Sequence, residues 1–262
     1  MLNIKDIGYK IGANQIINSI SVDFEPGKFH VVVGPNGSGK STFLKIFSGE
    51  IKPQQGLVQY DDTMLFKMDK VSLAQRRAVM SQSPELHFPL SIPEVVMMGR
   101  YPHFSYKPSK KDEAICEAAM EKMEVVHFRN RNYLTLSGGE KQRVQFARVL
   151  AQIWEAPATG SRYLFLDEPI SSLDIHYQHQ FLQIAKQLTS EKIVLIAVLH
   201  DLNLAIQYAD NILFMKEGRI KANGKPADVV TAGLIQYVFN IPVAIIDNPV
   251  GTKPLVVYNA GA

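Results

Sequence analysis

The first 60 residues show the alternation of apolar and polar positions that is typical of β-strands with one face in water. Leu2–Ile7 and Ile16–Phe24 alternate in this way, and Leu57–Tyr60 does so briefly. Phe29–Val33 is instead an apolar run, as expected of a strand that is buried on both faces. The pattern predicts an N-terminal part that is rich in β-strands.

Three later runs have the character of buried strands. Helix-length segments, notably Ile175–Leu188 and Leu202–Tyr208, separate them. Strands that alternate with helices predict a mostly parallel sheet with helices on its faces, which is an α/β fold. The three runs are Tyr163–Leu166, Ile193–Leu199 and Asn211–Met215.

The block from Pro89 to Trp154 differs from the rest of the chain because it contains no strand-like run. Prolines at positions 93, 102 and 108 punctuate it, and the sequence between them has helical character. We expect a helical subdomain inserted into the α/β core, with Glu155–Ser161 as a flexible linker after it. The expected division is 1–88 and 155–240 for the two parts of the core, 89–154 for the helical subdomain and 241–262 for a C-terminal tail.

Composition and charge exclude several classes of protein. The chain is 46% hydrophobic and 20% charged, which argues against disorder and low-complexity sequence. A net charge of +3, evenly spread, predicts no nucleic-acid binding. The longest wholly apolar run, Ile193–Leu199, is far shorter than the ~18 residues of a membrane-spanning helix. Since the start MLNIKDIGYK also lacks the apolar run of a secretion signal, we expect a protein that neither crosses a membrane nor is exported.

Cysteine and histidine usage predicts no metal centre built on these residues. The single cysteine, Cys116, excludes an internal disulfide and fits a reducing cytosol; we assign it no chemistry. His176 and His179 are three residues apart on a predicted helix, but no third ligand is evident.

A phosphate-binding loop follows the strand Phe29–Val33 directly. Gly34-Pro35-Asn36-Gly37-Ser38-Gly39-Lys40-Ser41-Thr42 matches G-x-x-x-x-G-K-[ST], and an apolar-periodic helix comes after it. Glycines allow successive backbone N–H groups to curl round a phosphate, and the helix N-terminus adds partial positive charge. Lys40 is expected to reach the β- and γ-phosphates of ATP, and the Ser41 hydroxyl to ligate Mg²⁺. Every residue from Gly34 to Thr42 is therefore a predicted ATP contact.

A pair of carboxylates, Asp167 and Glu168, follows the predicted strand Tyr163–Leu166. An acidic side chain at the end of a buried strand is desolvated unless it meets a cation, and Mg²⁺ beside the phosphate loop supplies one. We expect Asp167 to hold Mg²⁺. Glu168 points elsewhere and is the candidate that orients or deprotonates the attacking water.

The segment Leu136-Ser137-Gly138-Gly139-Glu140, followed by Lys141-Gln142-Arg143, resembles the signature motif of ATP-binding-cassette (ABC) ATPases. The resemblance extends over residues 2 to about 238 and implies a P-loop NTPase fold of the ABC type, with an inserted helical subdomain and an N-terminal β-rich part. It implies catalytic roles for Glu168, His200 as the switch histidine, and Lys40. It also implies that Tyr9 stacks on adenine, that Gln82 of the Q-loop contacts ATP and Mg²⁺, and that Ser137, Gly138, Gly139, Glu140 and the D-loop residue Asp174 bind ATP. One departure is Ile170, where the family often has threonine; no catalytic group is lost.

The resemblance also implies a homodimer. Ser137-Gly138-Gly139 opens the predicted helix Glu140–Ile153, which makes a second anion-binding helix N-terminus beside the one in the phosphate loop. In this family the signature motif of one subunit closes on the nucleotide that the other subunit holds. One chain with one P-loop and one signature motif therefore implies a two-fold dimer with two ATP molecules between the subunits.

Two classes of ABC ATPase remain as alternatives, the transporter subunit and the non-transport ATPase of repair, translation or iron–sulfur assembly. A short insert without heptads, a single cassette, and the apolar segment Ser83–Phe104, able to receive a helix from a partner, favour the transporter. The chain then resembles bacterial importers at the cytoplasmic face of the inner membrane. These have two separate permease subunits, and a periplasmic binding protein takes part indirectly.

Three segments are similar to importers of iron-siderophores, haem and cobalamin. Met98–His103 and Leu199–Ala205 resemble the whole group, and Ala147–Trp154 with the added Glu155–Ser161 is most similar to haemin-importer ATPases. The resemblance implies an ATP hydrolase that energises haem import. A ferric-siderophore or cobalamin importer is the alternative, and an ATPase of iron–sulfur assembly a more distant one.

Overall fold

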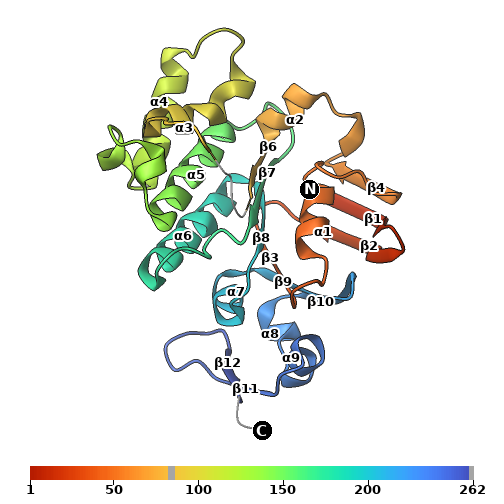
Figure 1. The fold of residues 1–262 in the computed structure, drawn as a ribbon. Coiled ribbons are helices and arrows are strands. Elements are labelled where there is room, and N and C mark those ends of the chain that lie inside the picture. The colour runs from red at the N-terminus through yellow and green to blue at the C-terminus, as the bar shows by residue number, and fades with distance from the viewer. Residues whose placement is uncertain (82–85, 260–262) are drawn as a thin grey trace. The chain divides into compact units, whose positions relative to one another are not determined.

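The computed structural model describes residues 1–81 and 86–259, and its chain forms two compact parts (Figure 1). The P-loop part consists of Met1–Lys67 and Leu188–Ala262, and the signature part of Met68–Gln187. No helix in the described ranges is long and apolar enough to span a membrane. The division at residues 88, 154 and 240 expected from the sequence stays a prediction.

The N-terminal strands of the P-loop part form an antiparallel sheet in the order β2-β1-β4-β5. The side chains of Leu2, Ile4 and Ile7 are buried, whereas Lys5 and Asp6 are exposed, so the alternation in the sequence gives the sheet one apolar face. The predicted β-rich N-terminal part is confirmed. The strands are β1 (Leu2–Ile11), β2 (Asn14–Phe24), β4 (Gln55–Tyr60) and β5 (Thr63–Met64).

A second sheet in the P-loop part is mostly parallel. Strand β3 (Phe29–Val33) pairs in parallel with β8 (Ile193–Val198) on one side and with β9 (Asn211–Lys216) on the other. All residues of β3 and β8 are buried, as their apolar sequences predict. Strand β10 (Arg219–Gly224) adds antiparallel to β9. No residue of β10 is fully buried, and its sequence RIKANG accordingly contains no apolar run. For this reason the sequence pattern did not predict the strand.

Four helices and a hairpin complete the P-loop part. Phe43 and Phe47 of α1 pack their rings on each other and on Phe24, with centroid distances of 4.9, 6.4 and 5.8 Å, which fixes α1 against the core. The residues after 240, for which the sequence predicts only a C-terminal tail, form an antiparallel hairpin. The helices are α1 (Lys40–Phe47), α7 (Leu202–Tyr208), α8 (Pro226–Val229) and α9 (Ala232–Phe239), with short 3₁₀ turns at Leu65–Lys67 and Thr189–Glu191; the hairpin strands are β11 (Val243–Ile246) and β12 (Leu255–Tyr258).

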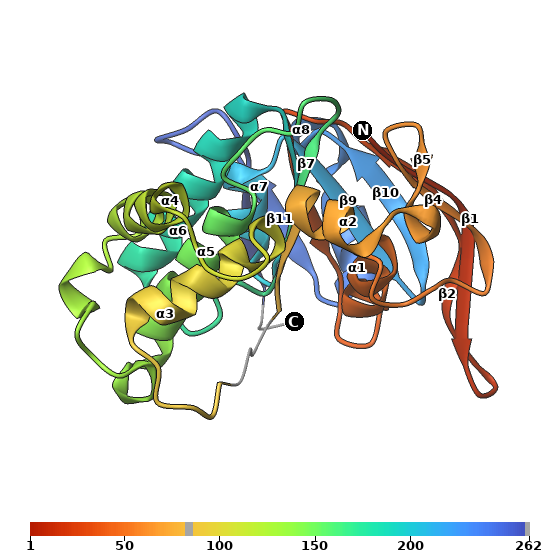
Figure 2. The ribbon, with the colours of Figure 1, turned by 90° about the horizontal axis from the view of Figure 1, so that it is seen from above.

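The signature part is mainly helical; α3, α4 and α5 pack on one another, and α6 lies beside α5 (Figure 2). The rings of Phe146 and Phe181 stack 4.0 Å apart between α5 and α6. Two parallel strands, β6 and β7, are also present; β6 was not predicted, because its four residues include Arg77 and are too few for a clear pattern. The elements are α2 (Lys70–Arg76), β6 (Arg77–Met80), α3 (Ile92–Met97), α4 (Lys110–Lys122), α5 (Gly138–Gln152), β7 (Arg162–Asp167) and α6 (Ile175–Leu188), with 3₁₀ turns at Met98–His103, Val126–Phe128 and Tyr133–Thr135.

Cys116 is packed inside the signature part on α4. Burial raises the pKa of its thiol to about 11, so the side chain stays neutral and acts as a small apolar group. No group of three or more His, Cys, Asp or Glu residues in the described part of the chain could hold a metal ion.

Candidate nucleotide site

The residues between β3 and α1 form a backbone cradle that excludes side chains. A Cβ atom on Gly34 would lie 2.3 Å from the Met215 carbonyl oxygen, so only glycine fits there. Gly37 and Gly39 have φ angles of 76° and 97°, in the left-handed region that favours glycine. Gly39 is the N-cap of α1 and provides no side-chain cap. The N-terminus of a helix directs backbone N–H groups and partial positive charge outward, so the start of α1 suits an anion.

Ser38 supports the same interpretation. Its side chain is 2% exposed, and its hydroxyl oxygen has no hydrogen-bond partner in the described structure. A buried hydroxyl without a partner costs free energy, which a phosphate oxygen at the cradle would recover. The loop thus fits the phosphate chain of ATP.

Lys40 is the cation of the cradle. Its side chain is buried, and its ammonium group donates hydrogen bonds to the carbonyl oxygens of Gly34 and Pro35, at 2.9 and 3.1 Å. These contacts hold the positive charge against the loop whose glycines shape the cradle. Pro35, Asn36, Ser41 and Thr42, the other predicted contacts, lie on this loop and at the start of α1.

The parallel sheet brings His200 to the edge at which the phosphate loop begins. The Leu199 N–H donates to the Val32 carbonyl oxygen at 3.2 Å, so β8 and β3 end side by side. His200 comes next and is exposed, and Asp201 then caps α7 by accepting from the Leu204 N–H at 2.9 Å. The structure therefore places the predicted switch histidine at the carboxyl edge of the sheet, where ligands bind in open α/β folds.

Tyr9 is half-buried on β1, where it pairs with Ile17 of β2. Strand β2 touches the phosphate loop, since a Cβ atom on Gly39 would lie 2.8 Å from the Ile16 carbonyl oxygen. The structure thus connects the strand pair that carries Tyr9 to the start of α1.

Asp167 is the last residue of strand β7 in the signature part, and Glu168 follows it. Asp167 is buried, and Glu168 has a φ angle of 51°, in a region that non-glycine residues rarely adopt. Such backbone conformations are costly and cluster at functional sites. The predicted roles of Asp167 and Glu168 stay predictions.

Ser137 begins the signature helix α5 as its N-cap. Its hydroxyl accepts from the Glu140 N–H at 3.3 Å, and the Glu140 carboxylate accepts from the Ser137 N–H at 2.7 Å, which is a capping box. Arg131 pairs with Glu140 at 3.3 Å, and the pKa of Glu140 is lowered, foremost by the Ser137 backbone hydrogen bond. Glu140 thus has a structural role that the sequence analysis missed, although the S-x-x-E spacing is its signal. Its predicted contact with ATP stays a prediction.

The signature motif and the D-loop line one pocket of about 570 Å³. A Cβ atom on Gly138 or Gly139 would lie 3.3 Å from Ser172 or Leu173 of the D-loop, so the two glycines allow the close approach of these segments. Ser137, Gly138, Gly139, Glu140 and Asp174, all predicted contacts of ATP, lie together at this pocket; His127, Phe128, Arg143, Ser172, Leu173 and Tyr177 complete its lining.

Arg143 connects the signature helix to the helix that follows the D-loop. Its buried guanidinium lies 4.3 Å from the ring centre of Tyr177 and 5.5 Å from that of Phe128. Stacking of this kind stabilises the arrangement of α5 and α6 around the pocket. The sequence analysis quoted Arg143 only as part of the motif, because its ring partners come from distant segments.

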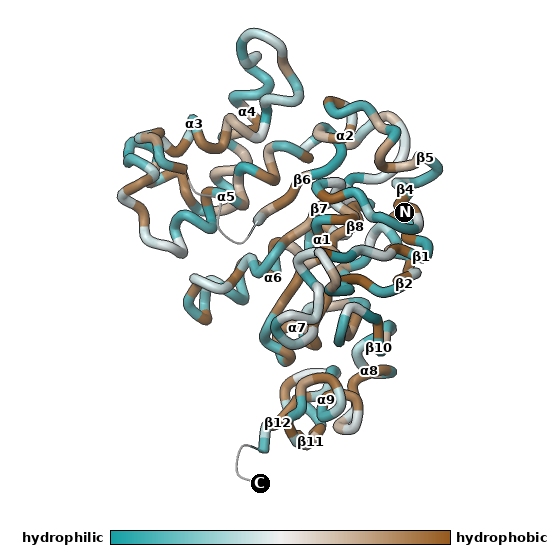
Figure 3. Tube along the Cα trace, turned by 45° about the vertical axis from the view of Figure 1, so that its right-hand side comes forward, coloured by the Kyte–Doolittle hydropathy of each residue, from teal (hydrophilic) through white to brown (hydrophobic). Residues whose placement is uncertain are grey.

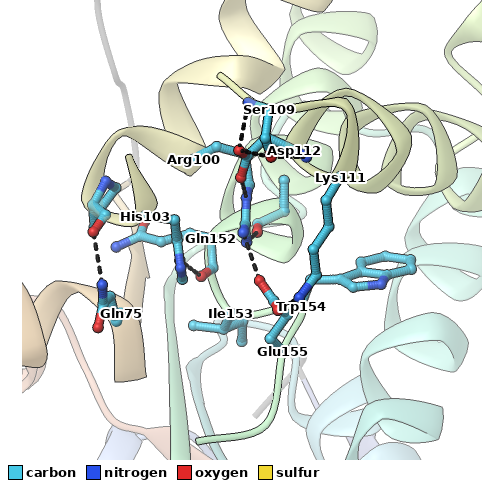
Figure 4. A network of polar contacts seen from close by, with 12 residues as sticks. Gln75, Arg100, His103, Ser109, Lys111, Asp112, Gln152, Ile153, Trp154 and Glu155 are labelled. Atoms are coloured by element: carbon cyan, nitrogen blue, oxygen red, sulfur yellow. Dashed lines mark hydrogen bonds and ion pairs between the residues drawn. The ribbon is translucent and has the colours of Figure 1, made fainter. Parts of the chain in front are cut away.

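The opposite end of α5 is held by a network around Arg100 (Figure 4). The Arg100 guanidinium, 1% exposed, donates to Asp112 at 2.9 Å, to the Ala151 carbonyl oxygen at 2.8 Å and to Glu155 at 2.6 Å. A ring nitrogen of His103 lies 2.8 Å from the Gln152 carbonyl oxygen. Cations and donors at the last carbonyl groups of a helix complement its dipole. The segment Met98–His103, a mark of family resemblance in the sequence, therefore anchors the signature helix.

The described residues leave two of the predicted sites untested, Gln82 and the Mg²⁺ site. Gln82 lies outside the described residues. The predicted Mg²⁺ ligands Ser41 and Asp167 belong to the P-loop part and the signature part respectively, so the Mg²⁺ site stays a prediction.

Comparison with known proteins identifies the family. A family model described as ABC transporter matches residues 17–171, more than half of the chain. Three similar proteins are each named hemin import ATP-binding protein HmuV, and the match covers 98% of this chain in every case. The protein from Methylobacillus flagellatus is 38% identical and covered to 95% of its length, and that from Gloeobacter violaceus is 42% identical and covered to 94%. The protein from Escherichia coli O157:H7 is 37% identical and covered to 99%.

Solved structures agree with the fold. A chain from an ABC transporter in an inward-facing conformation matches with a TM-score of 0.82 at 24% identity, over 98% of this chain and 96% of that chain. The dimeric bacterial ABC transporter cassette MJ0796 matches with a TM-score of 0.73 at 26% identity, over 86% and 98% of the two chains. The ABC-type P-loop fold expected from the motifs is confirmed, and the chain belongs to the ABC transporter family.

Proposed function

We propose that this protein is the ATP-binding subunit of a haem importer and hydrolyses ATP to energise transport through a separate membrane permease. The observation that carries the proposal is the 37–42% identity, over almost the whole of both chains, to proteins named for hemin import. The retained phosphate cradle and signature pocket support an active ATPase rather than an inactive relative.

In the proposed mechanism, the phosphate chain of ATP lies on the glycine cradle and the N-terminus of α1. Lys40 exchanges its carbonyl partners for phosphate oxygens, and the Ser38 hydroxyl gains an acceptor. Tyr9 stacks on the adenine. Ser41, Gln82 and Asp167 would hold Mg²⁺, which neutralises charge on the phosphates.

Hydrolysis then depends on positioned side chains. Glu168 orients the attacking water and accepts its proton, while His200, at the same sheet edge as the cradle, contacts the γ-phosphate. Ser137, Gly138, Gly139, Glu140 and Asp174 act on the nucleotide of a second copy of the chain. The proposed unit is thus a homodimer, since each chain carries half of each site.

The segment after Gln82 is the proposed docking surface for the permease at the cytoplasmic face of the inner membrane. Within it, Phe88 is 71% exposed and Tyr101 59%. Exposed aromatic side chains of this size are typical of protein interfaces. On each chain of the proposed homodimer, such a surface would receive a helix from one of the two permease subunits.

The test is transport with purified components. The subunit, its permease and its periplasmic binding protein are reconstituted in liposomes, and ATP hydrolysis is measured with haem, with a ferric siderophore and with cobalamin. We expect haem alone to stimulate hydrolysis and to enter the vesicles. Stimulation by the siderophore or cobalamin, without an effect of haem, would contradict the proposed cargo but not the ATPase.

A further inference from the structure

The C-terminal hairpin β11–β12 has no role in the mechanism above. Its strands pair from Val243 with Tyr258 to Ile246 with Leu255. An isolated two-stranded hairpin is marginally stable in water, so this one must be held by its neighbours. Figure 3 shows largely hydrophobic colour along α9 and the hairpin, and β12 contacts α7. The neighbours of the hairpin are therefore α9 and the helix that begins two residues after His200.

The first contact joins Asn203, in the first turn of α7, to the backbone of β12. The Asn203 amide nitrogen donates to the Val256 carbonyl oxygen at 3.1 Å, and the Val256 N–H donates to the Asn203 amide oxygen at 2.8 Å. Val256 is the buried residue of its strand. The side-chain amide thus satisfies both backbone polar groups of a buried residue, which makes the contact costly to break.

The second contact lies at the other end of α7. The Lys253 ammonium group, from the turn of the hairpin, donates to the Gln207 carbonyl oxygen at 3.0 Å and to the Ala209 carbonyl oxygen at 2.5 Å. A cation at the last carbonyl groups of a helix complements its dipole. The hairpin therefore contacts α7 in its first turn and at its end.

Helix α7 depends on such contacts for its position. It has seven residues, too few to be stable without tertiary packing. Its start is fixed by the Leu199 N–H bond to Val32 and by the Asp201 cap, and His200 lies between these two residues. A shift of α7 would move Asp201 and, with it, the backbone of His200.

We propose that the C-terminal hairpin positions His200 for ATP hydrolysis, and that Asn203 and Lys253 are the positioning residues that transmit this effect through α7. The inference rests on the proposed function, in which His200 contacts the γ-phosphate. It gives a catalytic purpose to residues 241–259, the tail about which the sequence alone says little.

The test uses two variants of the full chain, Asn203→Ala and Lys253→Met. We expect each to lower kcat for ATP hydrolysis roughly 10- to 100-fold, as small misplacements of a catalytic group do, while the KM for ATP stays close to wild type. Asn203→Ala should also lower the melting temperature, because it leaves the backbone groups of the buried Val256 unpaired, whereas the melting temperature of Lys253→Met should stay close to wild type. Both chains should be fully folded at the assay temperature. The NMR signals of the His200 imidazole should shift in both. Lys253→Arg retains a donor for the α7 carbonyl groups and should keep most of the wild-type kcat.

Matched controls come from the same part of the molecule. Asn223→Ala removes a 2.6 Å side-chain bond to Asn211 that does not touch α7, and Lys225→Met removes an exposed lysine. Both should hydrolyse ATP like wild type. If the Asn203 and Lys253 variants lower kcat no more than these controls, or lower it only because part of the chain is unfolded at the assay temperature, the hairpin does not position His200.

A His200→Ala variant separates this inference from the proposed function. Loss of hydrolysis in His200→Ala, with normal kcat in the Asn203 and Lys253 variants, overturns the inference alone. Wild-type hydrolysis in His200→Ala overturns the proposed role of His200 and the inference with it. Loss of kcat in all three variants, with the controls unaffected, supports both.

Discussion

Glu168 adopts a left-handed backbone conformation, with φ at 51°, directly after the buried Asp167. The proposed mechanism gives these two adjacent carboxylates different tasks, Mg²⁺ binding for Asp167 and activation of water for Glu168. The strain of such a residue is tolerated because the fully buried strand β7 fixes the backbone before it.

Replacement of Glu168 by glutamine tests the task of this carboxylate. The amide keeps the size of the side chain and can still donate and accept hydrogen bonds, but it cannot accept the proton of the attacking water. We expect Glu168→Gln to lower ATP turnover by roughly 100-fold or more. ATP binding, measured by equilibrium titration, should stay at the wild-type affinity. Substantial residual turnover would show that another group is the base.

At the residue scale, motifs with short spacing could be predicted from the sequence, and contacts between distant segments could not. Gly34 to Thr42 are consecutive, so their order alone determines the cradle. The partners of Arg143, by contrast, are Phe128 and Tyr177, which precede and follow it by many residues. No spacing in the sequence indicates that three such residues stack.

At the scale of elements, helix α5 is held at both ends. Ser137 and Glu140 form the capping box at its start, and the buried guanidinium of Arg100 bonds Ala151 near its end. Because the start of α5 faces the signature pocket, the network at its end contributes to the geometry of that pocket.

We expect Arg100→Ala to lower the free energy of unfolding by about 3–5 kcal/mol, because the substitution leaves the carboxylate of Asp112 buried without its cation. The matched control is Arg129→Ala, which breaks the exposed ion pair with Glu117 and should cost less than about 1 kcal/mol. Chemical denaturation of both variants measures the difference. Equal losses would contradict the assignment of Arg100 as the anchor of α5.

Asp112 gives the same network a pH dependence. Burial opposes ionisation of its carboxyl group, but hydrogen bonds from Ser109 and Arg100 outweigh this and lower its pKa from 3.8 to about 2. A carboxyl group whose pKa is lowered by folding stabilises the protein above its unfolded pKa, and this contribution is lost as the pH falls towards 2. We expect Asp112→Asn to be less stable than wild type at pH 6, and the gap in unfolding free energy to narrow below about pH 4. A gap that is independent of pH would contradict this role.

Element prediction succeeded where a segment was long or wholly apolar. Strand β3 and helices α6 and α7 have the bounds that the sequence predicts, and α5 differs from its predicted range by two residues at the start and one at the end. Strands β6 and β10 escaped prediction because they are short and contain arginine or lysine. Their strand character comes from pairing with a neighbour, which the local pattern does not show.

At the scale of the whole molecule, the family could be predicted because its motifs occur in order along one chain. The transported ligand could not be predicted from these motifs, because the residues that bind and hydrolyse ATP are not selected for the chemistry of haem. The resemblance of Ala147–Trp154 and Glu155–Ser161 to haemin-importer ATPases was the only indication, and Glu155 proves to be a partner of Arg100 rather than a plain linker residue.

The proposal that a second chain completes each ATP site leads to the last prediction. Ser137→Arg should abolish hydrolysis, because a large cation at the start of α5 prevents this helix end from approaching the nucleotide of the partner. It should leave ATP binding to the single chain intact, since Lys40 and the glycine cradle are unchanged. Loss of ATP binding by the monomeric variant would place Ser137 in the pocket of its own chain and contradict the shared site.

Mixing the Ser137→Arg chain with a Lys40→Ala chain sharpens this test. Each variant alone should be inactive, because both sites of its homodimer carry the same defect. In the heterodimer one site combines both defects, while the other pairs the intact phosphate loop of the Ser137→Arg chain with the intact signature motif of the Lys40→Ala chain. Subunit exchange should therefore restore part of the hydrolysis if one intact site suffices for turnover. Activity restored in the mixture, and absent from either variant alone, can arise only from a site built by two chains.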